Sequence, residues 1–261
     1  MIPISDENPT LTTPVMTWLI LGLTFAAWFV VQGGGMPGHE YQLVTSICNL
    51  GMVPGELTHR VAVGFSVPIA PGLACVVDRD PINKFTPLIS MFLHGGWGHI
   101  LGNAVFLWVF GNNIEDSMGP GRFLVFYLLC GLAAAATHVL VQPGSPVPTV
   151  GASGAISGVL GAYLVLYPRV RVNMLFWFLI FFRVFAIPAW IVLAYWFGIQ
   201  VLTGLPQLTS VRPDVSSGVA VWAHIGGFVA GMMLIRVFQN PRMVQARNTL
   251  RRERGLRPAR A

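Results

Sequence analysis

The stretch from Phe123 to Pro168 reads FLVFYLLCGLAAAATHVLVQPGSPVPTVGASGAISGVLGAYLVLYP and contains no Asp, Glu, Lys or Arg. One membrane-spanning helix needs about 20 apolar residues, so this run is long enough for two. The proline-rich segment 142–148 divides the run, because proline disrupts the interior of a helix. We therefore predict two membrane-spanning helices, at 122–141 and 151–167, joined by a short turn.

The composition of the whole chain also indicates a membrane protein. Of its 261 residues, 54% are hydrophobic and 10% are charged, whereas a soluble globular domain carries roughly 25% charged residues. This deficit of charge excludes a cytosolic enzyme, a disordered chain and a nucleic-acid-binding module. Four further apolar segments complete the predicted fold, an all-α membrane protein whose six transmembrane helices lie at 15–32, 93–113, 122–141, 151–167, 185–203 and 218–238.

The distribution of positive charge predicts how this bundle is oriented. Twelve arginines fall on the side that holds both ends of the chain, and four Lys or Arg residues fall on the other side. Because cytoplasmic segments are enriched in Lys and Arg, we predict a multi-pass protein of the cell membrane with both termini in the cytoplasm. The predicted parts are a cytoplasmic N-terminus at 1–14, a membrane domain at 15–238 with a long outer loop at 33–84, and a basic tail at 239–261. The tail directly follows an apolar segment, so we expect it to lie near anionic membrane lipid rather than to bind nucleic acid.

Three polar clusters interrupt the predicted spans, where polar side chains are costly and mark functional sites. The spans that hold these clusters are the second, the fourth and the sixth, which all run from the outside to the inside. We therefore expect the clusters to meet in the outer part of the bundle. Their sequences are His94-Gly-Gly-Trp-Gly-His99-Ile-Leu-Gly-Asn103, Gly151-Ala-Ser153-Gly154 and Ala223-His224-Ile-Gly-Gly227.

The residue types in these clusters fit nucleophilic catalysis. A serine hydroxyl is a weak nucleophile until a base accepts its proton, and a neutral imidazole is suited to that role. His99 and Asn103 are four residues apart, so they project from one helix face and could both donate hydrogen bonds to an oxyanion. No carboxylate lies within the nearby spans, so Ser153 and His224 would act as a dyad. Glycines on the two helices would allow close packing of their backbones; they are Gly154, Gly158, Gly161, Gly227 and Gly231.

The pattern H-x-x-x-N at 99–103, G-x-S-G at 151–154 and A-H-x-G-G at 223–227 resembles the rhomboid family of intramembrane serine proteases. The turn around Glu115 to Phe123 is also similar to that family's. The resemblance implies an endopeptidase that hydrolyses transmembrane protein substrates near the outer membrane face.

The resemblance also implies a role for each motif residue. Ser153 would be the nucleophile and His224 the general base. The backbone N–H of Ser153 and the side chains of His99 and Asn103 would form the oxyanion hole, and Gly151 would shape the turn before the serine. The fifth helix, around 190–197, and the loop 204–217 would gate substrate access.

The sequence departs from the family's pattern in two places. Ser157 stands where some members carry an aromatic residue that stacks on the catalytic histidine; we expect Ser157 to pack, with a hydrogen bond to His224 as the alternative. The first outer loop also differs in detail, so its role is carried over only loosely. Cys48 and Cys75 share this loop and could pair if it faces an oxidising compartment, and the sequence leaves this open.

Two other functions compete with proteolysis. A non-catalytic relative that binds membrane helices would lack the nucleophile or the base, whereas both are present. A transporter would need polar residues through the full depth of the bilayer, whereas the inner halves of the fourth and sixth spans are apolar. We expect no cofactor, and no metal site, because His94 and His99 have no third ligand in the pattern.

Two expectations concern residues outside the motifs. His39, His59 and His138 are predicted to be solvated. The tryptophans of the first and fifth spans are predicted to face lipid or the membrane interface, where this side chain is enriched; they are Trp18, Trp28, Trp177, Trp190 and Trp196.

Overall fold

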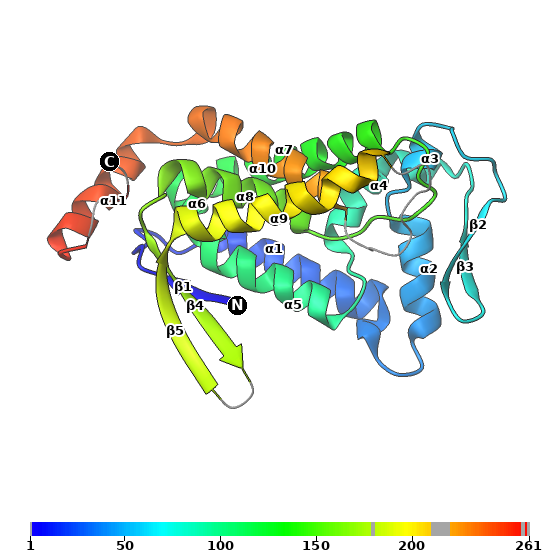
Figure 1. Cartoon of the computed structure of the whole chain (residues 1–261), viewed down its shortest axis with the longest axis horizontal. Helices are drawn as coiled ribbons and strands as arrows, with labels where there is room; N and C mark the ends of the chain where they lie inside the picture. The colour runs from blue at the N-terminus through cyan, green and yellow to red at the C-terminus, as the bar shows by residue number, and fades with distance from the viewer. Residues whose placement is uncertain (1, 179–180, 210–219, 257–258, 260–261) are drawn as a thin grey trace.

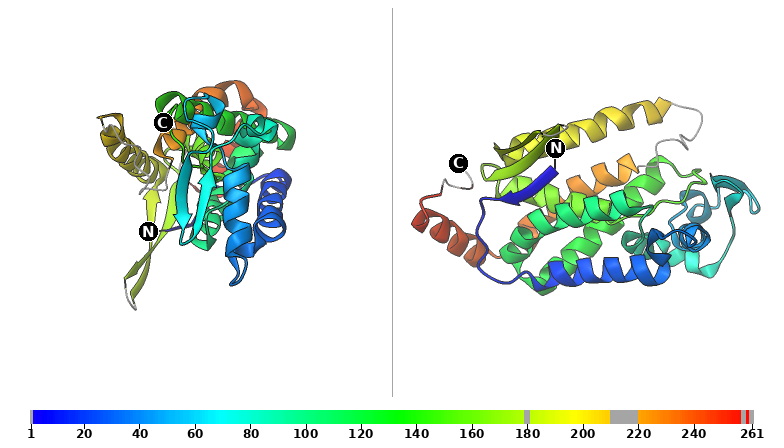
Figure 2. Two further views of the ribbon diagram at one scale, coloured as in Figure 1. Left: turned by 90° about the vertical axis from the view of Figure 1, so that its right-hand side faces the viewer. Right: turned by 90° about the horizontal axis from the view of Figure 1, so that it is seen from below.

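A computed structural model describes residues 2–178, 181–209, 220–256 and 259. It is a mostly helical bundle whose long helices run roughly along the longest axis of the molecule (Figure 1). Seen along two other directions, α1 and α9 lie at opposite sides of the bundle (Figure 2). The long helical segments are α1 (Val15–Ala26), extended by a π-helical turn to Val31, α5 (Trp97–Phe106), a π-helical turn (Leu107–Gly111), α6 (Asn112–Met118), α7 (Pro120–Val141), α8 (Ser153–Leu166), α9 (Ala189–Thr209) and α10 (Val221–Phe238).

Each predicted span contains one of these helical segments. Among the described residues, α7, α10 and the part of α9 from Ala189 to Gln207 are long and apolar enough to cross a membrane by length and composition. The helical runs Val15–Val31 and Ser153–Leu166 are shorter apolar helices. The chain is thus built as a multi-helix membrane bundle, and the count of six spans stays a prediction.

The described residues are mostly helical, as predicted, but the fold is not all-α, because five strands accompany the helices. Strands β1 (Ile2–Asp6), β4 (Arg171–Phe178) and β5 (Phe181–Pro188) form an antiparallel sheet in the order β1-β4-β5. Strands β2 (Ser66–Ala70) and β3 (Leu73–Val76) form a hairpin. The residues of β4 and β5 are largely β-branched and aromatic, which suits a strand. The fifth helix consequently begins at Ala189, after Pro188, rather than at residue 185.

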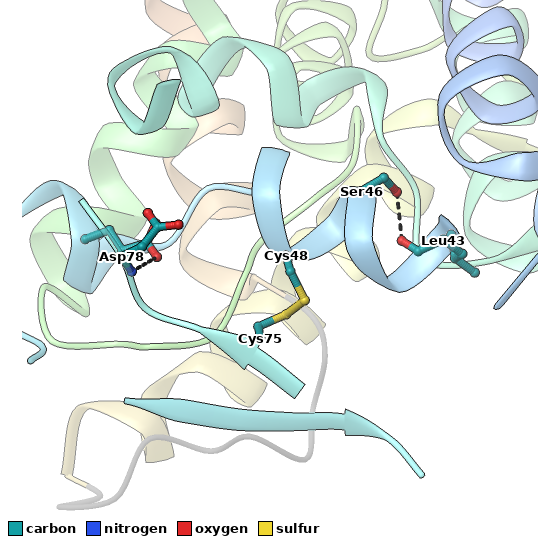
Figure 3. The surroundings of a disulfide bond; sticks show 6 residues. Leu43, Ser46, Cys48, Cys75 and Asp78 are labelled. Carbon is teal, nitrogen blue, oxygen red and sulfur yellow. Dashed lines mark hydrogen bonds between the residues drawn. A yellow bond between two sulfur atoms is a disulfide. The ribbon is translucent and has the colours of Figure 1, made fainter. Parts of the chain in front are cut away.

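The predicted outer loop is an ordered subdomain at one end of the bundle (Figure 1). Cys48 on α2 (Glu40–Leu50) and Cys75 on β3 form a disulfide with a Cα–Cα distance of 5.0 Å (Figure 3). The pairing that the sequence left open is therefore present, and it ties a helix to the hairpin. The remaining short helices of this region are α3 (Pro54–Leu57) and α4 (Thr86–Ile89), with 3₁₀ turns at Gly33–Gly35, Pro81–Phe85 and Ser90–Phe92.

The opposite end of the bundle holds α11 (Pro241–Glu253), where two arginines depart from the expectation for the basic tail. Arg247 and Arg251 are buried in the protein instead of facing lipid, with 0% and 2% of their surface exposed. Arg247 forms a salt bridge with Asp116, whose carboxylate also accepts hydrogen bonds from the backbone N–H groups of Leu11 and Thr12. Burial acts to raise the pKa of Asp116, but the Arg247 charge and these hydrogen bonds lower it overall.

Two expectations about exposure are also wrong. Trp28 is fully buried and packs edge-on against Trp97 at a ring distance of 5.5 Å, so it does not face lipid. His138 is buried at the end of α7, with its Nε2 atom 3.2 Å from the Thr149 hydroxyl, so it is not solvated. Trp18, Trp177 and Trp190 are exposed as predicted.

Candidate active site

Helices α8 and α10 approach each other so closely that their glycines touch the partner backbone. A Cβ atom added to Gly227 would lie 2.0 Å from the Gly154 carbonyl oxygen, and one added to Gly231 would lie 1.9 Å from that of Gly158. One added to Gly161 would lie 2.1 Å from the Phe228 carbonyl oxygen. The predicted close packing of the glycine faces is therefore confirmed, and it brings the starts of the two helices together.

This packing places Ser153 and His224 in direct contact. Ser153 is the first residue of α8, and His224 lies in the first turn of α10. The Ser153 Oγ atom is 2.7 Å from the His224 Nε2 atom, which is a hydrogen-bond distance. The two residues are 71 positions apart in sequence, and both are half-buried.

The far side of the His224 ring contacts α9, which the sequence did not predict. The Nδ1 atom of His224 is 2.9 Å from the Oε1 atom of Gln200. The Trp196 ring lies 5.8 Å from the His224 ring, tilted by 41°. No local sequence pattern predicts a role for Gln200, because its contact with His224 depends on how α9 is rotated about its axis against α10.

His99 lies on the other side of Ser153, beside Gly151. The backbone N–H of Gly95 donates to His99 Nδ1 at 3.3 Å, so the proton of a neutral His99 ring is on Nε2. A Cβ atom built on Gly151 would lie 2.7 Å from that Nε2 atom and 3.6 Å from Ser153 Oγ. The space over Gly151 is therefore within reach of both a donor and a hydroxyl.

Asn103 is oriented by a second histidine. Its Nδ2 group donates to His94 Nε2 at 2.8 Å, which leaves the other Nδ2 hydrogen available. His94 is fully buried, and its backbone N–H and C=O both bind the side chain of Gln32, at 2.7 and 2.8 Å. His94 therefore has a structural role, because it links Asn103 on α5 to Gln32 in the turn that follows α1.

Ser157 does not reach His224. Its hydroxyl donates to the Ser153 carbonyl oxygen at 2.6 Å, and its side chain is fully buried. This agrees with the expectation that Ser157 packs within α8, and the alternative of a bond to His224 is absent. The aromatic contact to His224 comes from Trp196 on α9 instead.

These groups line one cavity of about 640 Å³. Its wall includes Ser153, His224, His99 and Asn103, with Trp196 at one side. No three His, Cys, Asp or Glu side chains within the described ranges come together as metal ligands. Of the predicted gate, residues 190–197 lie on α9. The prediction of a loop is wrong for residues 204–209, because they continue this helix, and 210–217 lie outside the described residues.

Comparison with known proteins places this site in a family. The profile described as "Rhomboid domain" matches residues 81–240, more than half of the chain. RHOMBOID-like protein 5 of Arabidopsis thaliana is 28% identical over 164 residues, which cover 60% of this chain and 53% of that protein. Rhomboid protease GluP of Bacillus subtilis is 42% identical over 79 residues, covering 30% of this chain and 14% of that protein.

A third relative is Rhomboid-like protease 5 of Toxoplasma gondii, 31% identical over 159 residues that cover 59% of this chain and 16% of that protein. The chain thus spans about half, or less, of the length of these relatives. The matched segment contains all three polar clusters and most of the residues that line the cavity. The chain belongs to the rhomboid family.

Proposed function

We propose that this protein is an intramembrane serine endopeptidase that cleaves transmembrane proteins near the outer face of the membrane. The single observation that carries the proposal is the 2.7 Å contact between Ser153 Oγ and His224 Nε2 inside a cavity lined by hydrogen-bond donors. A nucleophile and a base within hydrogen-bond reach define the active centre of a serine hydrolase.

The first half of the reaction forms an acyl-enzyme. The Ser153 oxygen attacks the scissile carbonyl carbon while His224 Nε2 accepts the hydroxyl proton. The tetrahedral intermediate then collapses, the C–N bond breaks, and His224 gives this proton to the leaving amine. The products of this half are an ester between Ser153 and the amino-terminal part of the substrate, and a released carboxyl-terminal fragment with a new free amino group.

The second half restores the enzyme by hydrolysis. Water attacks the ester carbon and gives one proton to His224. The C–O bond to Ser153 breaks, and the proton returns from His224 to the serine oxygen. The amino-terminal fragment is released with a new carboxylate at its end, and the step is a hydrolysis in which no group changes oxidation state.

Three donors would stabilise the oxyanion of each intermediate. The N–H of Ser153 opens α8, and the first N–H groups of a helix have no acceptor within it. His99 carries its proton on Nε2, beside the space over Gly151, and Asn103 keeps one amide hydrogen. Losing one such donor typically costs about 3 kcal/mol of transition-state stabilisation.

The substrate is proposed to be a helix that unwinds at its outer end. A helix hides its carbonyl groups in its own hydrogen bonds, so the scissile bond must leave the helix first. We therefore expect good substrates to carry Gly, Pro or Ser near the outer boundary. The same proposal places the 15–238 membrane domain in the cell membrane with residues 1–14 and 239–261 in the cytoplasm, supported by the excess of arginine on that side.

Cleavage of a single-span reporter by the full chain in detergent tests the function. We expect the wild type to cleave it, and Ser153→Ala and His224→Ala to lose at least about 10³-fold of the rate, as removal of a triad member does in soluble serine proteases. Ser157→Ala is the matched control, because this buried serine lies one turn further along α8 and should leave most of the activity.

Two outcomes would contradict the proposal. Cleavage that persists in Ser153→Ala would exclude Ser153 as the nucleophile. Binding of the reporter without cleavage, together with no labelling by a serine-directed probe, would instead assign a non-catalytic helix-binding role.

A further inference from the structure

Helix α9 holds the His224 ring from the side opposite to Ser153. Gln200 contributes its side-chain oxygen to His224 Nδ1 at 2.9 Å, and Trp196 contributes the tilted ring contact. The two residues are four positions apart, so they lie on one face of α9. The orientation of the ring is therefore set jointly by α9 and by Ser153.

The contact with Gln200 also determines where the imidazole carries its proton. A carboxamide oxygen only accepts hydrogen bonds, so Nδ1 must be the protonated nitrogen of the neutral ring. The lone pair of Nε2 then faces the Ser153 hydroxyl, 2.7 Å away. This is the tautomer that a general base needs, and the other tautomer could not accept the serine proton.

We propose that Gln200 is a positioning residue for His224, in the place that an acidic residue occupies in the usual serine protease triad. The inference rests on the proposed function and adds a third member to its dyad. A neutral amide fixes the ring and its tautomer, as a carboxylate does, but stabilises the imidazolium less because it carries no net charge.

The position of Gln200 also links the base to the least buried of the long apolar helices. In its most apolar window, 17% of α9 is buried, compared with 39% in α7 and in α10. Figure 2 places α9 at the side of the bundle. Any outward displacement of α9 would therefore withdraw Gln200 from His224.

The test compares two substitutions of Gln200 with a control on the same helix. Gln200→Leu keeps the size but removes the acceptor, and we expect kcat to fall about 10- to 100-fold, as for loss of an orienting partner, with KM nearly unchanged. Gln200→Glu should retain most of kcat, and the acidic limb of its pH–rate profile should move to higher pH, because a carboxylate favours the imidazolium. Thr203→Val is the control, since that exposed hydroxyl bonds only within α9.

A second readout does not depend on turnover. Nitrogen-15 NMR of labelled histidine reports which ring nitrogen is protonated, and comparison with His224→Ala assigns the signal. We expect the Nδ1–H tautomer of His224 in the wild type and a mixture of tautomers in Gln200→Leu.

The outcomes separate this inference from the proposed function. Loss of kcat in Gln200→Leu with an unchanged tautomer, and no shift of the pH profile in Gln200→Glu, would show a merely structural role and overturn the inference. Wild-type kinetics in Gln200→Leu would overturn it as well. An inactive wild type would refute the proposed function, and the NMR comparison would still decide whether Gln200 sets the tautomer.

Discussion

Gly151 shows how a single residue creates the working space of the site. Its φ of +127° lies in the region that favours glycine, and the missing side chain leaves room between His99 and Ser153. Its N–H donates to the Ser90 carbonyl oxygen at 2.9 Å, which fixes the turn before α8. A glycine is thus required for two separate reasons, the backbone conformation and the space for a substrate carbonyl.

We predict that Gly151→Ala abolishes cleavage while the protein stays folded. The added methyl group would occupy the space 2.7 Å from His99 Nε2, and we expect at least about a 100-fold loss of rate, comparable to loss of an oxyanion donor. The strain of the backbone should cost only about 1–2 kcal/mol of stability. A cleavage assay and thermal unfolding in detergent measure the two effects.

Gly144→Ala is the control for this change. Gly144 lies in the loop before α8, is exposed and has nothing within 4 Å of an added Cβ atom. Normal cleavage by Gly151→Ala would show that the space over this glycine does not receive the substrate.

The catalytic residues differ in how far the sequence reveals them. Ser153 and His224 are recognisable because a polar side chain is costly in an apolar, glycine-flanked span and so indicates a function. Their contact was expected because the fourth and sixth spans run in the same direction, which puts the two residues at a similar depth. Gln200 is invisible in the sequence because 24 residues separate it from His224 and nothing fixes the rotation of α9. The bond between Asn103 and His94 depends in the same way on how the chain turns before α5.

Helices α8 and α10 form the element that holds the dyad together. Their contact is made by backbone against backbone, because small residues allow helices in a membrane to approach closely. The distance between Ser153 and His224 is therefore controlled by these glycines, of which Gly154 lines the cavity and Gly231 does not. Gly231 lies about two helical turns from His224, so a substitution at Gly231 tests the packing of the two helices without changing a group that takes part in the chemistry.

We predict that Gly231→Ala destabilises the protein and lowers activity together. Its Cβ atom would lie 1.9 Å from the Gly158 carbonyl oxygen, so the helices must move apart, and overpacking of this kind costs about 1–3 kcal/mol. Thermal unfolding and cleavage measured on the same preparation test this. Gly22→Ala on the exposed face of α1, with no neighbour within 4 Å, should be neutral; an equally neutral Gly231→Ala would contradict the packing account.

Elements were predicted well where hydrophobic length decides and poorly where pairing decides. A long apolar run that crosses a bilayer must satisfy its own backbone hydrogen bonds, which a helix does, so the sequence predicts α7, α8 and α10. Strands β4 and β5 lie in a largely apolar segment, but they pair with each other, and β4 also pairs with β1, from the other end of the sequence. Such distant pairing leaves no periodic signal in the segment itself, which explains the late start of α9.

At the scale of the whole molecule, both ends of the described chain are tied to the same end of the bundle. Asp6, at the end of β1, accepts hydrogen bonds from Tyr163 on α8 and from Asn113 on α6, the latter at 2.8 Å. Arg247 of α11 binds Asp116 and donates to the Asn113 carbonyl oxygen at 2.8 Å. Arg247, which the sequence analysis expected near anionic lipid with the rest of the basic tail, thus belongs to an internal network.

This network makes stability depend on pH through Asp6. Burial raises the pKa of the Asp6 carboxyl from 3.8 to about 6, although the hydrogen bonds from Tyr163 and Asn113 and the charge of Arg247 act in the opposite direction. A group with a raised pKa binds its proton more tightly in the folded state than in the unfolded state. Its contribution to stability is therefore complete below pH 4 and is lost as the pH rises through about 6.

We predict that Asp6→Asn removes this dependence. An amide keeps the size of the side chain and cannot ionise, so the variant should gain stability over the wild type as the pH rises from 4.5 to 7.5, by at most about 3 kcal/mol. Thermal unfolding of both proteins in detergent across this range measures the difference. Glu253→Gln is the control, because Glu253 is an exposed carboxylate at the end of α11. A difference between Asp6→Asn and wild type that stays flat, or shrinks with rising pH, would show that Asp6 is ionised in the folded protein throughout and that Arg247 outweighs the effect of burial.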